Sequence, residues 1–324
     1  MQGDIYYNKA LAGYTSWRVG GPAKCIYCPT DQDDLVEFLA TVPPDEPLLW
    51  LGHGSNLLVR DGGFPGTVIV TKGILNNIEI IESLNPNLDL EENQTLRQIQ
   101  AQAGVSCPKF ARFAAHAGLM GAEFLAGIPG TLGGALALNA GAFGGETWNL
   151  IANVMTVDRT GAIYHRTPNE YQIGYRSVTL KSDSSISIRS DTTQHDSLST
   201  LYNQEWFLQA TFSLRPGSVI EAKDNIKQYL TKRSANQPIG LPSAGSTFRN
   251  PPGDHAGRLI EASGCKGLRI GGAEVSTKHA NFIINLGRAT ASDIEALIEQ
   301  VQKTVHQHFG VHLIKEVQII GIAL

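Results

Sequence analysis

The sequence predicts an α+β protein built from two or three domains. Its 324 residues are 42% hydrophobic and 17% charged, a composition that provides a sizeable core. A chain of this length usually divides into more than one domain. Strand-like and helix-like runs are interspersed without the regular βαβ rhythm of a doubly wound sheet, so α+β domains are expected.

The first seventy residues predict short strands and one helix. Thr30 is a suitable N-cap for this helix, and the pair Pro43-Pro44 ends it. Residues 48–51 and 67–70 are expected to be strands on either side of a glycine-rich turn. The apolar face of the helix is formed by Leu35, Val36, Leu39 and Val42.

The middle of the chain, residues 72–216, predicts a second group of strands around a helix. The helix is expected between an N-cap at Ser106 and a stop at Gly118. A loop around Asn85–Asn87 and the Ser-, Asp- and Thr-rich segment 182–200 are expected to be exposed. Strands are expected at residues 78–81, 96–103, 154–157 and 206–214.

The last third of the chain begins near Val219 and predicts two helices and a closing strand. The second helix has the clearest pattern in the chain, after Ser292 and before Gly310, and residues 311–320 form the strand. The first helix is indicated by Ala222, Ile226, Tyr229 and Leu230. The second is indicated by Ile294, Leu297, Ile298, Val301, Val305 and Phe309.

Charge and composition exclude several classes of protein. A net charge of −4 makes a nucleic-acid partner unexpected. No apolar run approaches the ~20 residues of a membrane span, and the N-terminus has no basic start followed by an apolar segment, so a cytoplasmic protein is expected. Cys25 and Cys28 lie in a strand-like run without a second pair, so they are expected to be packing thiols rather than zinc ligands.

The C-terminal third is mildly basic. Residues 218–324 hold 12 Lys and Arg against 9 Asp and Glu, a net +3, whereas the rest holds 14 against 21, a net −7. This distribution suits an anionic small ligand, although three extra charges carry little weight alone.

Two glycine-rich stretches, residues 51–58 and 127–146, are suited to contact with phosphate groups. Glycine permits a positive φ and close backbone approach, so successive N–H groups can converge on an anion. Neither stretch has the spacing of a dinucleotide-binding βαβ fingerprint or of a P-loop. Together they favour a dinucleotide cofactor bound by another fold.

The most specific motifs lie in the C-terminal third. They are Pro242–Pro251, Ala256–Glu261, Gly264–Gly267, Gly271–Ser276, Lys278–Asn285 and Lys315–Val317, and Gly174–Ser177 precedes them in the middle segment. With the glycine stretches, these motifs resemble the UDP-N-acetylenolpyruvoylglucosamine reductases, also called UDP-N-acetylmuramate dehydrogenases or the MurB family. The resemblance runs from Tyr14 to Gly321 and is to the shorter type, which lacks an extra substrate-covering loop.

The resemblance implies a two-subdomain FAD-binding (PCMH-like) module followed by a smaller α+β substrate-binding domain. The implied domains are residues 1–71, 72–217 and 218–324, the last of which closes over the substrate. The implied cofactor is noncovalent FAD, with NADPH as co-substrate. The implied reaction reduces the enolpyruvyl ether of a UDP-sugar in peptidoglycan precursor synthesis. Nothing indicates an oligomer, so a monomer is expected, and no metal site is predicted.

The implied catalytic residues are Arg176, Ser246 and Glu316. Hydride addition leaves negative charge beside the carboxylate of the substrate. The fixed cation of Arg176 would stabilise this charge. Glu316, if protonated, would act as an acid near that charge. In a strand, Glu316 would share a face with Ile314, Gln318 and Ile320, which favours partial burial. Ser246, by resemblance, donates the proton to the α-carbon.

Binding residues follow from the same resemblance. The cofactor residues are Gly52, His53, Gly54, Ser55, Asn56, Leu57, Gly127, Ile128, Pro129, Gly130, Thr131, Gly133, Gly134, Asn139, Ala140 and Gly141. The substrate residues are Tyr175, Arg233, Gln237, Asn250 and Asn281.

Two other functions stay open from the sequence. His53 stands where a small or amide residue is expected, which leaves room for another FAD-dependent oxidoreductase or oxidase on the same fold. The other function is a UDP-sugar-binding protein that has lost its flavin. Retention of all three catalytic residue types argues against it.

Overall fold

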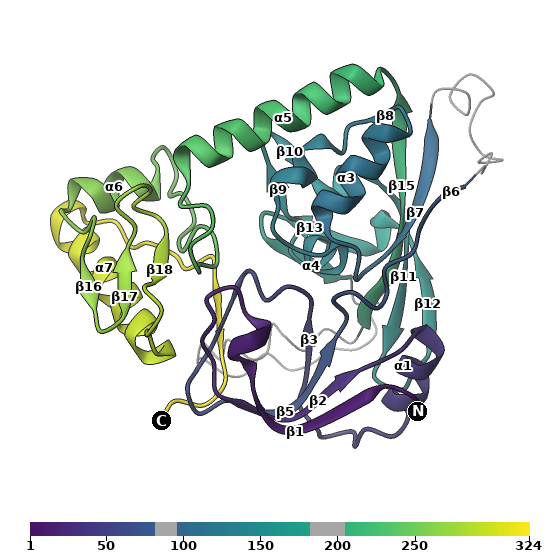
Figure 1. Cartoon of the computed structure of the whole chain (residues 1–324), viewed down its shortest axis with the longest axis horizontal. Helices are drawn as coiled ribbons and strands as arrows, with labels where there is room; N and C mark the ends of the chain where they lie inside the picture. Colours follow the sequence, from purple (N-terminus) through teal and green to yellow (C-terminus); the bar gives the residue numbers. More distant parts are fainter. Residues whose placement is uncertain (82–95, 182–204) are drawn as a thin grey trace.

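A computed structural model describes residues 1–81, 96–181 and 205–324 (Figure 1). The predicted loop at Asn85–Asn87 and the predicted exposed segment 182–200 lie outside these residues. Within the described ranges, no helix combines the length and apolar character needed to cross a bilayer.

The N-terminal sheet has four strands in the order β1-β2-β5-β3. β1 is antiparallel to β2, and the other two pairs are parallel. The strands are β1 (Asp4–Ala10), β2 (Pro22–Cys28), β3 (Leu48–Leu51) and β5 (Phe64–Val70), with the 3-10 turn η1 (Leu11–Tyr14) after β1. The predicted strands at 48–51 and 67–70 are confirmed. Cys25 and Cys28 lie in β2 as free thiols.

The first helix, α1 (Gln32–Leu39), confirms the predicted helix but corrects its start and its end, since Val42 lies beyond it. Asp31, not Thr30, is the N-cap, because its carboxylate accepts the Asp34 N–H at 2.9 Å. Leu35 and Leu39 are buried beneath the helix, whereas Val36 is only partly buried.

The middle segment forms a sheet in the order β12-β11-β15-β7-β6, with the short β8 also paired to β15, and all pairs are antiparallel. Its strands are β6 (Ile78–Ile81), β7 (Arg97–Gln102), β8 (Leu119–Met120), β11 (Ile151–Asp158), β12 (Ile163–Arg166) and β15 (Glu205–Pro216). All four predicted strands are present.

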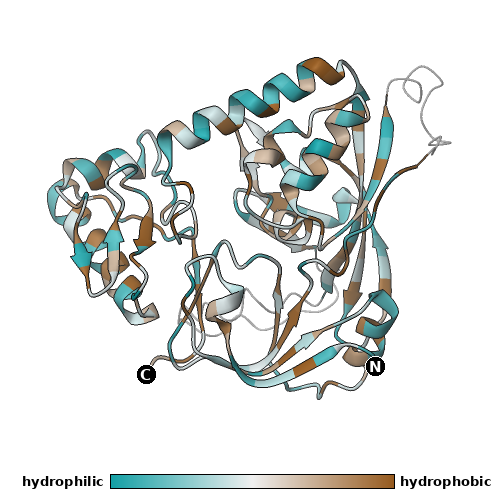
Figure 2. Ribbon diagram, viewed as in Figure 1, coloured by the Kyte–Doolittle hydropathy of each residue, from teal (hydrophilic) through white to brown (hydrophobic). Residues whose placement is uncertain are grey.

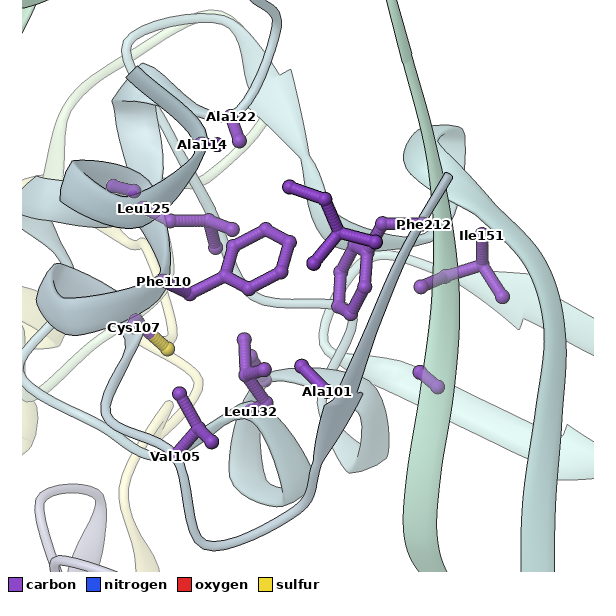
Figure 3. Close-up of a cluster of buried hydrophobic side chains, with 14 of the residues drawn as sticks. Ala101, Val105, Cys107, Phe110, Ala114, Ala122, Leu125, Leu132, Ile151 and Phe212 are labelled. Atoms are coloured by element: carbon purple, nitrogen blue, oxygen red, sulfur yellow. The ribbon is translucent and has the colours of Figure 1, made fainter. Parts of the chain in front are cut away.

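The helix α3 (Cys107–His116) packs on this sheet and confirms the predicted N-cap Ser106; its C-cap is Ala117, and the predicted stop, Gly118, follows with a left-handed φ of 68°. Phe110 from the helix meets Phe212 from β15 with ring centroids 4.2 Å apart (Figure 3). This cluster forms the core of the middle segment.

Several short elements lie between α3 and β15 in the sequence, and those before β11 carry most of the second glycine stretch. They are η2 (Glu123–Gly127), α4 (Leu132–Ala137), β9 (Gly141–Ala142), β10 (Gly145–Glu146), η3 (Thr147–Leu150), η4 (Pro168–Glu170), β13 (Tyr171–Gly174) and β14 (Ser177–Leu180). The strands β13 and β14 form a hairpin with Tyr175 and Arg176 at its tip.

The long helix α5 (Val219–Asn236) links the middle segment to the C-terminal elements (Figure 1). Hydrophilic and hydrophobic residues are mixed along it (Figure 2), and its buried side chains are Ala222 and Ile226. The C-terminal elements are α6 (Ala256–Ala262), α7 (Ala291–Phe309) and the sheet β16 (Arg269–Ile270), β17 (Ala273–Val275) and β18 (Ile283–Asn285).

The predicted last helix is confirmed as α7, with a left-handed Gly310 at its end. Its N-cap is Thr290, so Ser292 lies inside the helix rather than before it. The predicted strand 311–320 is wrong for most of its length, since only β19 (Gln318–Ile320) is a strand. Lys315 forms a single bridge with Phe248.

The chain ends by returning to the N-terminal segment. β19 pairs in parallel with β4 (Leu57–Val59), which overlaps the end of the first glycine stretch. Arg60 donates to both carboxylate oxygens of Glu295 in α7, at 2.7 and 2.9 Å. Asp61 accepts the N–H groups of Ala291 and Ser292 at the start of α7. The C-terminal elements are thus fixed to the N-terminal segment by backbone pairing and by charged contacts.

Candidate active site

The two glycine stretches, far apart in the sequence, lie against each other. A side chain on Gly52 would overlap the Thr131 hydroxyl, so only glycine allows this approach. A Cβ on Gly130 would have the Ser55 Oγ as its nearest atom, at 3.6 Å. We call residues 52–57 and 127–134, taken together, the glycine cradle.

The cradle presents unused backbone donors. The second loop is fixed by three backbone bonds: Cys107 N–H to Gly130 O, Leu132 N–H to Val105 O, and Gly133 N–H to Ala103 O, at 2.8–2.9 Å. Within the described ranges, no protein group accepts from the N–H groups of His53, Gly54, Ser55, Asn56, Gly130 or Thr131. Such a set of free donors fits the phosphates of a dinucleotide.

His53 adds an orphaned polar atom to the cradle. Its Nδ1 is buried and has no hydrogen-bond partner among the described residues. Burial, and secondarily the charge of Lys72, lower the pKa of the imidazole below its ordinary value. A neutral, half-buried imidazole with an unsatisfied nitrogen fits contact with a bound polar cofactor.

Three other residues predicted to bind the cofactor, Asn139, Leu57 and Ala140, also have structural roles. Asn139 is buried; its amide donates to Glu146 Oε2 at 2.9 Å and to the Gly174 carbonyl at 3.3 Å, and its oxygen accepts the Trp148 N–H. Its side chain therefore holds the base of the hairpin tip. Leu57 and Ala140 are buried apolar residues of the core. The others lie along the second stretch: Gly127, Ile128, Pro129, Gly133, Gly134 and Gly141.

The hairpin tip places Arg176 and Tyr175 on Glu316. Arg176 adopts a left-handed φ of 53° and donates from Nε and Nη2 to Glu316 Oε1, at 2.8 and 2.7 Å. The Tyr175 hydroxyl donates to the other carboxylate oxygen at 3.2 Å. The side chain of Glu316 is 8% exposed, so this ion pair is largely shielded from water.

The burial of Glu316 has a different cause from the one predicted. Ile314 is 62% exposed, so Glu316 does not lie on an apolar strand face with Ile314 and Ile320. Arg176 and Tyr175 cover it instead. The contact comes from a hairpin 140 residues earlier in the sequence, which strand alternation cannot reveal.

The segment of Ser246 is attached directly to Glu316. The Glu316 N–H donates to the carbonyl of Thr247 at 2.8 Å. Asn56 of the glycine cradle donates to the carbonyl of Glu316 at 3.2 Å, and its own carbonyl accepts from Gln318 at 3.0 Å. The structure thus brings Ser246, Arg176, Glu316 and the cradle into one region. Ser246 is half-buried and follows Gly245, which has a φ of 78°.

Asn281 holds the Ser246 segment in place. Its side-chain oxygen accepts the Phe248 N–H at 3.0 Å, and its side-chain nitrogen donates to the Phe248 carbonyl at 2.8 Å. Its own carbonyl accepts the Thr247 N–H at 2.8 Å. The side chain, predicted to bind substrate, is buried, and both its oxygen and its nitrogen bond to the Phe248 backbone.

The remaining predicted substrate residues lie on α5 and next to α6. Arg233 donates to Gln237 at 2.9 Å, has no carboxylate partner within the described ranges, and has its pKa lowered by burial. Asn250 is exposed, and its side-chain oxygen accepts the Ala256 N–H at the start of α6. Arg233 is therefore a half-buried cation available to an anion.

Two residues near Glu316 were not predicted from the sequence. Thr247 and Arg249 each have a buried polar side-chain atom without a partner in the described chain. Their positions on either side of Phe248 were a usable signal, because alternate residues of an extended segment share a face.

A cradle with free N–H donors beside a cluster of Arg, Glu and Ser side chains defines a flavin-dependent oxidoreductase. In agreement, residues 23–166 match the FAD binding domain family. Residues 237–320 match the C-terminal domain of UDP-N-acetylenolpyruvoylglucosamine reductase. The chain belongs to the UDP-N-acetylenolpyruvoylglucosamine reductase family.

Relatives of that name cover nearly the whole chain. The protein from Alkalilimnicola ehrlichii is 49% identical over 99% of this chain and 96% of its own length. The one from Methylococcus capsulatus is 50% identical over 98% and 93%. The crystal structure of the MurB enzyme from Thermus caldophilus covers 99% of this chain and 100% of its own, at 31% identity and a TM-score of 0.75. The predicted family, its fold class and FAD as cofactor are confirmed.

Proposed function

We propose that this chain catalyses the NADPH-dependent reduction of UDP-N-acetylglucosamine enolpyruvate to UDP-N-acetylmuramate, a step of peptidoglycan precursor synthesis. The observation that carries the proposal is the junction at Glu316. Its side chain binds Arg176, its N–H binds the carbonyl next to Ser246, and its carbonyl binds Asn56 of the cradle. All three predicted catalytic residues therefore lie beside the proposed cofactor site.

The glycine cradle would hold the FAD through its free N–H groups, with His53 Nδ1 as an additional polar contact. When bound, FAD supplies the hydride chemistry that links NADPH to the substrate. The cradle would bind and orient the cofactor. Arg176 at the hairpin tip would stabilise the negative charge that develops, and the Ser246 segment would supply the proton.

Arg176 is the group proposed to stabilise developing charge. Its planar guanidinium matches a carboxylate in two hydrogen bonds, and here Glu316 occupies it. A substrate carboxylate of similar geometry would compete with Glu316 for Arg176. Substrate binding would then release the Glu316 carboxylate from this pair and free it to face the substrate as the proposed acid.

Ser246 is proposed to deliver the proton to the α-carbon of the substrate. No hydrogen bond within the described chain engages its hydroxyl. The backbone around it is fixed by Asn281 and by Glu316, so the hydroxyl is held in position without being occupied. A fixed and free hydroxyl suits a group that acts once per turnover.

The rest of the substrate is proposed to bind along the C-terminal elements. Arg233, without a carboxylate partner in the described chain, suits a diphosphate, and Gln237 orients its guanidinium. Tyr175 and Asn250 offer further polar contacts. Residues 1–71, 72–217 and 218–324 are proposed as the three domains, supported by the separate main sheet in each; the β19–β4 pair joins the last domain to the first. Monomeric state and cytoplasmic location remain predictions.

The test is substrate-dependent turnover by the pure, FAD-loaded protein. NADPH oxidation followed at its absorbance band should require UDP-N-acetylglucosamine enolpyruvate and yield UDP-N-acetylmuramate by mass spectrometry. No turnover with this substrate would refute the proposal. Oxygen consumption with small alcohols, without need for the UDP-sugar, would support the alternative of an oxidase.

A further inference from the structure

The short pairing around Phe248 and Lys315 determines which side chains share a face. The backbone N–H of Glu316 donates to the Thr247 carbonyl at 2.8 Å, and the backbone N–H of Arg249 donates to the Ile314 carbonyl at 2.9 Å. These bonds flank the Phe248–Lys315 bridge in antiparallel fashion. In such a pairing, Thr247 and Arg249 point to the same side as Glu316. Arg249 is therefore a neighbour of the proposed catalytic carboxylate.

Arg249 lies beside Glu316 yet is not its partner. Both carboxylate oxygens of Glu316 are engaged by Arg176 and Tyr175. Within the described ranges, Arg249 forms no ion pair, and its Nε is buried without a hydrogen-bond partner. A buried guanidinium N–H without a partner is costly unless a ligand completes it.

The Tyr175 ring lies close to both arginines. The guanidinium carbon of Arg249 is 5.9 Å from the Tyr175 ring centroid, and that of Arg176 is 5.7 Å from it. Both distances are within the range of a cation–π contact. Among the described residues, the cluster thus pairs two cations with one carboxylate, which leaves one positive charge unmatched.

A second orphaned atom on the same face strengthens the case. The Thr247 hydroxyl is buried and has no partner in the described chain. A hydroxyl and a guanidinium N–H two residues apart on one face form a pair of donors suited to an oxyanion.

We propose that Arg249 is a further binding residue of the active site, which holds an oxyanion of the UDP-sugar against Tyr175. The inference rests on the proposed function, because the UDP-sugar provides that anion. The oxyanion is either the carboxylate of the lactyl or enolpyruvyl group or an oxygen of the diphosphate. Both share the chemistry that a planar guanidinium recognises.

The experiment compares two ligands on the FAD-loaded protein. UDP-N-acetylmuramate carries both the carboxylate and the diphosphate, whereas UDP-N-acetylglucosamine carries only the diphosphate. Dissociation constants would be measured by calorimetry for wild type, R249Q and R249K. The control is R288Q, which removes an exposed cation of the same C-terminal segment. Flavin content and melting temperature would show that each variant is folded.

R249Q should lower the affinity for UDP-N-acetylmuramate by about 10- to 100-fold, the loss typical of a hydrogen bond to a charged group. R249K should lower it by less. If Arg249 binds the diphosphate, R249Q should lower the affinity for UDP-N-acetylglucosamine by the same factor. If Arg249 binds the carboxylate, R249Q should bind UDP-N-acetylglucosamine as tightly as the wild type does. Wild-type affinity of R249Q and R249K for both ligands, or equal losses in R288Q, would overturn the role of Arg249. Failure of the wild type to bind UDP-N-acetylmuramate would instead count against the proposed function.

Discussion

The N–H of Glu316 donates to the carbonyl of Thr247, so the proposed acid and the residue after Ser246 are joined by one backbone hydrogen bond of 2.8 Å. A shift of the final segment would therefore move Ser246 as well as Glu316. The two residues form one positioned unit whose orientation also depends on Asn281 and Asn56. This coupling guides the first two predictions.

Replacing Ser246 by Ala should separate the two half-reactions. Reduction of the flavin by NADPH should proceed as in the wild type, because no proton is delivered to carbon in that step. Reoxidation by the enolpyruvyl substrate should slow by about 10²- to 10⁴-fold. Stopped-flow absorbance of the flavin measures both rates. Equal slowing of the two would contradict the proton-donor role.

Replacing Asn281 by Ala should damage both stability and turnover. The change leaves the N–H and the carbonyl of buried Phe248 without partners, at a cost of about 2 to 4 kcal/mol in the free energy of unfolding. Because Ser246 would lose its fixed position, kcat should fall more than KM rises. Urea denaturation and steady-state kinetics test this. A rise in KM alone would indicate direct substrate binding instead.

Replacing Gly130 by Ala should test the glycine cradle. A Cβ there would lie 3.6 Å from Ser55 Oγ, an ordinary contact, so the melting temperature of the flavin-free protein should hardly change. The methyl group would project toward the proposed phosphate site, so FAD affinity should fall about tenfold or more. Flavin fluorescence titration measures it. Gly13→Ala, where a Cβ meets nothing within 4 Å, is the control. Unchanged FAD affinity would remove Gly130 from the cofactor site.

His53 should make stability depend on pH. Burial lowers the pKa of His53, so the folded protein binds fewer protons there than the unfolded chain. The stabilising contribution is therefore present above the unfolded pKa of about 6.5 and declines as pH falls below it. When the pH of flavin-free protein is lowered from about 7.5 to about 5.5, the free energy of unfolding should fall less in His53→Gln than in the wild type. His279, whose pKa burial also lowers, provides a second variant for comparison. Identical losses in wild type and His53→Gln would contradict this effect.

The sequence predicted elements whose signals are local. The capping residues of α3 and the apolar spacing of α7 can be identified from residues close together in the sequence, and both helices were confirmed. Asp31 replaced Thr30 as the cap of α1 because two adjacent residues offer similar oxygens, and only the folded backbone selects one.

Long-range pairing limited the other predictions. Residues 311–317 alternate like a strand, but their partner is a short segment around Phe248 that offers one bridge. Asn281 was assigned to substrate by resemblance, and nothing in the sequence indicates that Phe248 uses both ends of its amide. Arg249 was missed because its lack of a carboxylate is a property of the folded surroundings.

The pairing of β19 with β4 has a consequence for how the protein is made. During translation, the glycine stretch and β4 leave the ribosome roughly 260 residues before the strand that pairs with them. The edge of β4 that pairs with β19 must therefore stay unpaired until residues 318–320 have been made. Glu316 is made just before β19, so its contacts with Asn56 and Arg176 can form only when this pairing does.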